Sequence, residues 1–116
     1  MNYDIVTQGA RTAAFLLNEA SGERSREQIL LLKGTAAFPA GQILSKNAAG
    51  KYVAFAAPAE GATVEVAILY EGRAADNTAD RYSTGVVRDC EVIESELVGL
   101  TDPARAALAA AGIILR

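Results

Sequence analysis

Short apolar segments separated by turn residues run through most of this 116-residue chain, and a helical pattern occurs once, near the C-terminus. The clearest segment covers 63–70, where Val64, Val66 and Ile68 share one face at a spacing of two, as a half-buried strand requires. Strands that alternate with turns and precede one late helix are typical of a small compact α+β, mainly β domain, not of an alternating βαβ fold. Much of the apolar content is alanine, so the core depends on Ile, Val and Leu.

Two pairs of segments are predicted to form hairpins. Residues 13–17 and 28–32 flank the polar stretch 18–24, which indicates a hairpin with a charged tip. Ile43-Leu44 and 52–55 flank an Asn/Gly turn and give the second hairpin. Two later segments complete the series of strands, at 83–87 and, past a bend, at 89–93.

The only strong helix signal begins at Thr101, a capping residue, with Pro103 at the first helical position. Residues 104–111 are strong helix formers, and Gly112 is a typical stop. A helix of about three turns does not persist alone in water, so it must pack on the sheet. Residues 113–115 (Ile-Ile-Leu) are then predicted to be a final strand in the core or at a subunit interface.

The first residues differ from the rest of the chain. Residues 1–12 mix polar and apolar side chains without a sustained period, and Gly9 adds a break. We therefore expect an N-terminal arm over 1–12 and one β-rich domain over 13–116, with no linker that divides it.

Composition excludes several classes of function. The net charge of -3 and the absence of a Lys/Arg run argue against nucleic acid as a partner. The chain has no histidine, and its single cysteine, Cys90, has no partner for an internal disulfide. No phosphate-binding loop occurs, since Ser45 stands where the pattern ending in Gly50-Lys51 needs glycine, and we expect no cofactor. Without a signal peptide or a membrane-spanning run, the product is expected in the cytoplasm, not in a membrane.

A few residues are of types that can act in catalysis. Cys90 lacks a histidine to activate it, and in a strand rich in Val and Ile it is expected to be a small buried hydrophobe. Glu94 and Glu96 would share one face of an extended segment, and Asp76 and Asp80 bracket a loop. Such carboxylates suit a hydrolase or a calcium site, but acidic residues placed in this way are more often solvated. We therefore expect no enzyme activity.

Arg24 and Arg26 are spaced by two across Ser25. If they project from the tip of the predicted hairpin, their guanidinium groups suit the carboxylates of an acidic protein surface. The alternative is that they keep the tip soluble.

Several short motifs, taken in order, resemble the head decoration protein family of tailed phages, of the lambda decoration protein type. The resemblance extends from about Phe15 to the C-terminus. None of the motifs is specific alone, and their order and spacing carry the resemblance. The segments are Phe15-Leu16-Leu17-Asn18-Glu19-Ala20, Arg24-Ser25-Arg26-Glu27, Ala40-Gly41-Gln42-Ile43-Leu44, Gly50-Lys51-Tyr52, Val66-Ala67-Ile68-Leu69-Tyr70 and the stretch from Ala107 to Arg116.

The resemblance implies a β-rich fold, tulip- or barrel-like, with a small helical part. It further implies a homotrimer at three-fold and quasi-three-fold positions of the expanded capsid, with the major capsid protein as partner, the outer virion surface as location and adhesion as function. The chain departs from the lambda type in its amino-terminal region and in its length before Gly41, so the capsid contacts are open. Residues expected to contact the capsid are Asn2, Tyr3, Ile5, Val6, Arg11, Arg24 and Arg26.

Three other functions stay open from the sequence. Another small virion protein, such as a fibre-anchoring or head completion protein, would share the same enzyme-free profile. A ligand-binding β module, for a sugar for example, would need stacked aromatic side chains, but the chain has no Trp and its Phe and Tyr are scattered. A small hydrolase would have to use Glu94, Glu96 or an aspartate.

Overall fold

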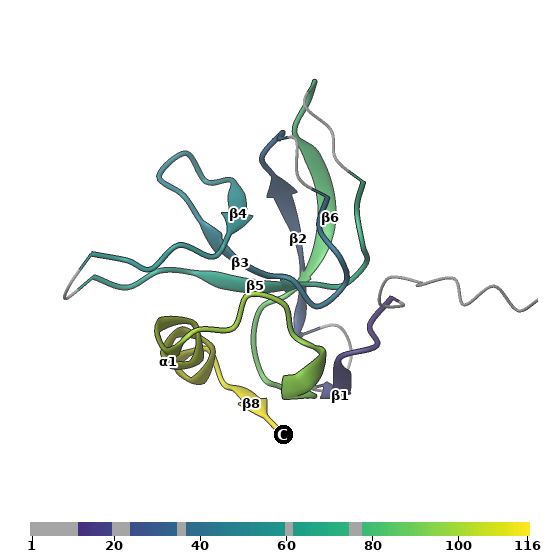
Figure 1. Ribbon diagram of the computed structural model, residues 1–116, viewed down its shortest axis with the longest axis vertical. Coiled ribbons are helices and arrows are strands. Elements are labelled where there is room, and N and C mark those ends of the chain that lie inside the picture. Colours follow the sequence, from purple (N-terminus) through teal and green to yellow (C-terminus); the bar gives the residue numbers. More distant parts are fainter. Residues whose placement is uncertain (1–11, 20–23, 35–36, 60–61, 75–77) are drawn as a thin grey trace, which may run out of the picture.

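The computed structural model describes residues 12–19, 24–34, 37–59, 62–74 and 78–116. These residues form a closed β-barrel, a smaller second sheet and one α-helix (Figure 1). The predicted α+β, mainly β class, with one short C-terminal helix and a final strand, is therefore confirmed. The predicted arm lies outside the described residues except for Thr12, so the division into an arm and a domain stays a prediction.

The barrel closes through five strands in the order β2-β4-β3-β5-β6. Its longest ladder joins β2 to β6 in antiparallel register, from Arg26↔Val86 to Leu31↔Arg81. β3 pairs antiparallel with β4, so the second predicted hairpin is confirmed. One parallel pair between β2 and β4 completes the ring. The bounds are β2 Arg26–Leu31, β3 Ile43–Lys46, β4 Tyr52–Ala54, β5 Val66–Leu69 and β6 Arg81–Val86.

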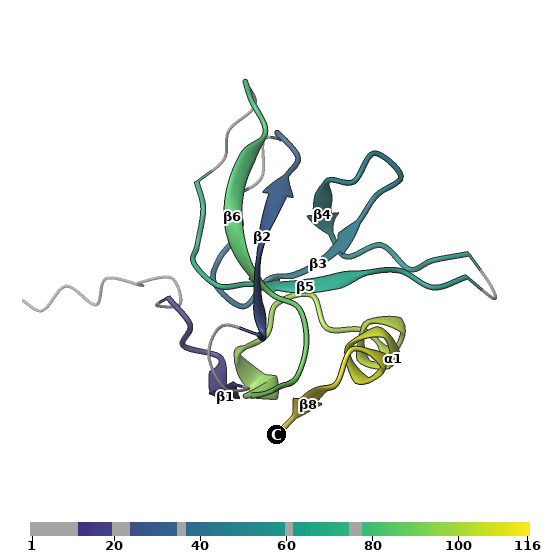
Figure 2. The same ribbon diagram turned by 180° about the vertical axis from the view of Figure 1, so that it is seen from behind.

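The second sheet lies below the barrel, with strand order β1-β7-β8. β1 (Leu16–Glu19) runs antiparallel to β7 (Cys90–Val92), and β8 (Ile113–Leu115) runs parallel to β7. Parallel neighbours need a crossover connection. The short 3-10 helix η1 and the α-helix α1 supply it, and Figures 1 and 2 show α1 beneath β5. Their bounds are η1 Glu94–Glu96 and α1 Asp102–Ala110.

Two apolar clusters form the core, and β5 contributes to both. One cluster fills the barrel; the other lies between the barrel, α1 and the small sheet. All four residues of β5 are buried, so the expectation of a half-buried strand is wrong. The barrel interior covers one face of β5 and α1 with the small sheet covers the other. The barrel cluster contains Ile29, Leu31, Leu44, Tyr52, Ala67 and Leu69, and the second contains Phe15, Ile43, Val66, Ile68, Val86, Cys90, Val92, Ala104, Leu108 and Ile113.

Close packing inside the barrel depends on Gly85 in β6. A Cβ atom at this position would lie 2.9 Å from Cδ1 of Ile29 and 3.1 Å from Cβ of Ala67. Contacts that short are not tolerated without movement of the neighbours. Glycine therefore leaves room for the Ile29 side chain of β2 and the Ala67 methyl group of β5 to pack against β6.

The helix forms as its end signals predict. The Thr101 hydroxyl accepts a hydrogen bond from the backbone N–H of Ala104 at 3.3 Å, and Pro103 occupies the first turn. Ala104 and Leu108 are the buried residues of α1. Gly112 then takes a left-handed conformation, with φ of 79°, which favours glycine. No helix in the described part of the chain is long and apolar enough to span a membrane.

The first predicted hairpin is wrong, because β1 and β2 belong to different sheets. β1 pairs with β7, whereas β2 pairs with β4 and β6. Burial explains the difference: Phe15 enters the second cluster and Ser25 is fully buried, with its hydroxyl donating to the backbone oxygen of Asp89 at 2.8 Å. Ser25 therefore links the segment before β2 to the residue before β7 in the small sheet, and it is not part of a solvated tip.

The predicted final strand is confirmed, but its three residues have different surroundings. Ile113 is 2% exposed and belongs to the second cluster, and Leu115 packs against that cluster. Ile114 is 49% exposed on the opposite side of the strand. Of the two isoleucines, only Ile113 is therefore part of the core.

Ile113→Ala should lower the free energy of unfolding by about 2 to 5 kcal/mol, because the lost methyl and methylene groups leave a cavity in the second cluster. Ile114→Ala, the matched control next to it, should change that free energy by about 1 kcal/mol or less. Urea denaturation of the two variants measures the difference. Equal losses would contradict the assignment of Ile113 to the core.

Truncation after Gly112 removes the whole of β8. The loss should cancel a large part of the roughly 5 to 15 kcal/mol by which a domain of this size is stable. A truncated chain that keeps the melting temperature of the full chain would show that β8 is dispensable.

Candidate interaction surface

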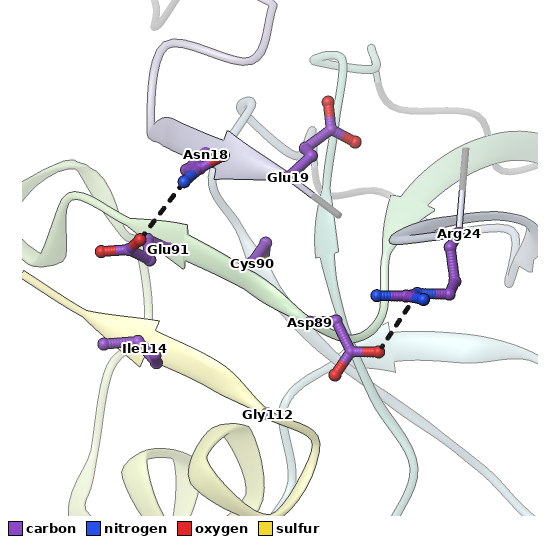
Figure 3. A pocket seen from close by; sticks show the side chains of 8 residues that line it. All are labelled: Asn18, Glu19, Arg24, Asp89, Cys90, Glu91, Gly112 and Ile114. Atoms are coloured by element: carbon purple, nitrogen blue, oxygen red, sulfur yellow. Dashed lines mark hydrogen bonds and ion pairs between the residues drawn. The ribbon is translucent and has the colours of Figure 1, made fainter. Parts of the chain in front are cut away.

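A shallow hollow of about 600 Å³ lies against the small sheet (Figure 3). The residues that line it come from β1, from the segment that leads into β2, from β7 with the residue before it, and from β8 with its preceding turn. Four of them are charged, so the surface is polar. The lining consists of Asn18, Glu19, Arg24, Asp89, Cys90, Glu91, Gly112 and Ile114.

Strand register gathers these side chains. Asn18 on β1 and Ile114 on β8 both lie opposite Glu91 on the central strand, so the three are cross-strand neighbours. A Cβ atom at Gly112 would lie 2.8 Å from Oδ1 of Asp89. Glycine at this turn therefore allows the chain to pass close to the Asp89 carboxylate on its way into β8.

Glu91 is the central acidic group of the hollow. Its carboxylate accepts hydrogen bonds from Nε of Arg116 at 2.7 Å and from Nδ2 of Asn18 at 3.4 Å. These donors, Arg116 first, lower the pKa of Glu91 below its usual range. The group is therefore ionised at neutral pH.

Arg26 is linked to the hollow through Glu19, one of the residues that line it, and it also contacts Tyr70. Its Nε and Nη2 donate to the Glu19 carboxylate at 2.8 and 2.5 Å, a two-pronged pair that joins β2 of the barrel to β1 of the small sheet. Its guanidinium carbon lies 4.4 Å from the centre of the Tyr70 ring. The side chains of Arg26 and Glu19 are 33% and 17% exposed, so the pair is half-buried.

Arg24 is more exposed than Arg26, although the two arginines look equivalent in the sequence. Its side chain is 65% exposed, and its Nε lies 3.7 Å from Oδ2 of Asp89. The Arg24 guanidinium is therefore open to an external partner. The remaining predicted contact residues, Asn2, Tyr3, Ile5, Val6 and Arg11, lie outside the described residues.

Cys90 has the character of a buried hydrophobe. It is 5% exposed, and burial, followed by the charges of Glu19 and Asp89, raises the pKa of its thiol to about 11. The thiol is protonated at neutral pH, and the thiolate is the nucleophilic form.

Two of the carboxylates considered as possible catalytic residues, Glu94 and Asp80, form ion pairs with basic side chains of the chain. Glu94 and Glu96 lie in η1, so their expected extended arrangement is wrong, and Glu94 forms an ion pair with Arg105. Asp80 accepts from Nζ of Lys51 at 2.7 Å and from the backbone N–H of Lys33 at 2.8 Å, contacts that lower its pKa. Asp76 lies outside the described residues. Within the described ranges, no group of three His, Cys, Asp or Glu residues is arranged to hold a metal ion.

Sequence reasoning missed most of the hollow. Five of its residues come together only because β1, β7 and β8 pair across long stretches of chain. These residues are Asn18, Asp89, Glu91, Gly112 and Ile114. The acidic residue between two apolar ones in Cys90-Glu91-Val92 predicts that the Glu91 side chain points outward. No local pattern, however, identifies the residues that surround Glu91. The arrangement offers ion pairs and hydrogen-bonding groups on a shallow surface, which suits recognition of a protein.

Comparison with known proteins gives one positive result. The family model described as bacteriophage lambda head decoration protein D matches residues 5–113. No curated protein and no solved structure matches the chain significantly. The family match covers nearly the whole chain and agrees with the resemblance in the sequence. The chain therefore belongs to the bacteriophage lambda head decoration protein D family and is a structural, non-enzymatic capsid decoration protein of the virion surface.

Proposed function

We propose that this decoration protein binds the outer surface of the expanded head and stabilises it against rupture by the pressure of the packaged DNA. The observation that carries the proposal is the family match over residues 5–113, because it identifies the capsid as the partner. The fold supports the mechanism: a closed barrel without free strand edges, joined to a second packed layer, is a stiff body for linking capsid subunits.

Stabilisation follows from linkage. A protein that binds the assembled, expanded shell and not its separated subunits lowers the free energy of the assembled state. A capsid under pressure fails where neighbouring subunits separate, so a body that contacts several subunits raises the cost of that separation. No chemical step is required.

We further propose a homotrimer at the three-fold and quasi-three-fold positions of the head. Three copies held together contact several capsid subunits at once, and each further contact forms at a high effective concentration. Weak individual contacts are then sufficient. The arm at residues 1–12 is proposed to add to these contacts, by pairing with an exposed capsid strand or by lying on a neighbouring subunit.

The purified protein should bind expanded heads and not procapsids, because the proposed site is created by maturation of the shell. Co-sedimentation with the two kinds of particle, at matched subunit concentration, measures this. We expect at least about a tenfold difference in the apparent Kd, a free-energy difference of about 1.4 kcal/mol. Equal binding to both particles would contradict recognition of the expanded state, and no binding to expanded heads would contradict the function itself.

Deletion of residues 1–11 should weaken binding to expanded heads at least about tenfold, because each copy loses one set of linked contacts. The free energy of unfolding of the free protein, measured by urea denaturation, should change by no more than about 0.5 kcal/mol, the range of a neutral surface change. A large loss of stability would show that the arm belongs to the fold.

Arg24→Ala and Arg26→Ala should separate binding from stability. Arg24→Ala should weaken binding to heads and reduce its dependence on salt, because an exposed charge acts through screened electrostatics. Arg26→Ala should lower the free energy of unfolding by about 1 to 3 kcal/mol, because the half-buried Glu19 carboxylate loses its partner. Binding isotherms at two salt concentrations and urea denaturation measure the two effects. An unchanged isotherm for Arg24→Ala would show that this arginine is merely solvated.

A further inference from the structure

The guanidinium group of Arg73 is buried without a hydrogen-bonding partner in the described part of the chain. Its three nitrogens, Nε, Nη1 and Nη2, are shielded from solvent, and none of them donates a hydrogen bond. A guanidinium carries five N–H donors and a permanent charge, so this whole capacity is unused. Burial of a charge without an acceptor is costly, and native structures seldom contain one. The fold alone therefore gives this charge no compensation.

Other basic side chains in the described ranges are paired with carboxylates. Seven of them, from Arg24 to Arg116, each form an ion pair with an aspartate or a glutamate. Glu71 lies only two residues before Arg73, but its side chain is exposed and accepts no hydrogen bond from the Arg73 nitrogens. The acceptor that Arg73 lacks is therefore not supplied by a carboxylate of the described residues.

Arg73 belongs to the connection between β5 and β6, which runs along the side of the barrel away from α1 (Figures 1 and 2). Its backbone is fixed by an antiparallel bridge to Phe38, with N–H to O=C distances of 2.7 and 2.9 Å between the N and O atoms. The residue as a whole is half-buried, so its exposed part is the backbone or the carbon stem. Long basic side chains usually keep the charged head in water, and here that arrangement is reversed.

The segment that leads into β1 joins the fold close to this connection. The backbone N–H of Ala13 donates to the carbonyl oxygen of Tyr70 at 2.8 Å, and Arg73 follows Tyr70 by three residues. Ala13 is the first residue after the arm at residues 1–12, which is proposed to contact the capsid. Arg73 therefore lies on the side of the molecule where that contact begins.

We propose that Arg73 is an anchor for the capsid, with a carboxylate of the major capsid protein as its acceptor. The inference rests on the proposed function and adds a residue that binds the shell. In the free protein the guanidinium is turned inward and unpaired. On the expanded head it turns outward, by rotation about its side-chain bonds, and forms a two-pronged pair with the carboxylate, the geometry that a guanidinium matches best. Pairing on the capsid then recovers the stability that the free chain loses by burying this charge.

Arg73→Met should change stability and binding in opposite directions. Methionine keeps an unbranched side chain and removes the buried charge, so the melting temperature of the free protein should rise by about 3 °C or more. The apparent Kd for expanded heads, measured by co-sedimentation, should rise at least about tenfold, because the capsid carboxylate loses its partner. A purely structural arginine would behave differently: its loss would lower the melting temperature and leave the binding of the folded protein unchanged.

Arg105→Met is the matched control. It removes the same charge from α1, on the other side of the barrel, where the arginine side chain is 47% exposed and pairs with Glu94. Exposed pairs of this kind contribute little to stability, so the melting temperature should not rise. The Kd for expanded heads should stay within about twofold of that of the parent chain. The control therefore separates loss of the anchor from a general change in net charge.

Cross-linking with a carbodiimide identifies the source of the carboxylate. The reagent condenses a lysine amine with a carboxylate in contact and does not couple arginine, so Arg73→Lys places a reactive amine at the anchor. In expanded heads, peptide mass spectrometry should find residue 73 joined to an aspartate or a glutamate of the major capsid protein. Arg105→Lys is the positive control, because its amine should be joined to Glu94 of the same chain.

The outcomes separate this inference from the proposed function. A raised melting temperature, weakened binding and a link to the major capsid protein together would support the anchor. Unchanged binding or a lowered melting temperature of Arg73→Met would overturn it and leave capsid binding intact. A link from residue 73 to its own chain or to a second copy, or no link at all, would do the same. Failure of the unmodified chain to bind expanded heads would overturn the proposed function, and the melting temperature of Arg73→Met would still decide whether the buried charge is costly.

Discussion

Burial of β5 and β3 on both faces is the constraint on which the rest of the structure depends. Val66 and Ile68 point toward α1 and the small sheet, while Ala67 and Leu69 point into the barrel. Ile43 and Leu44 on β3 divide in the same way. The two strands thus form a wall between two apolar clusters. A chain with so few aromatic residues gains its core by using both sides of this wall, and neither cluster would be closed without it.

The class of fold was predictable because its signals are local. The cap at Thr101, the proline that follows it and the glycine after the helix each act within a few residues, and α1 formed where they indicated. The hairpin of β3 and β4 is local in the same sense. The pairing of β1 with β7 and of β7 with β8 joins segments more than twenty residues apart and depends on which side chains enter the second cluster. For that reason the first hairpin, the two-sided burial of β5 and most of the hollow could not be read from the sequence.

The contrast between Arg24 and Arg26 shows the same limit at the level of single residues. In the sequence they are equivalent, two arginines on either side of a serine. Ser25 is buried against Asp89, so the chain passes between the two sheets at this point. Arg26 is thereby brought to Glu19 and Tyr70, where it joins the sheets, and Arg24 is left at the rim. Their roles follow from the burial of the residue between them, which the spacing of charges does not reveal.

The hollow at the small sheet has the chemistry of a protein contact that depends on charge. It is lined by Arg24, Asp89 and Glu91, side chains whose interactions with another protein weaken as salt is added. These groups are not equally available to a partner. The Glu91 carboxylate already accepts hydrogen bonds from Arg116 and Asn18, whereas the Arg24 side chain is 65% exposed and lies 3.7 Å from Asp89. A partner that meets this surface therefore gains most by supplying an acceptor to Arg24, because that contact requires no existing short hydrogen bond to be broken.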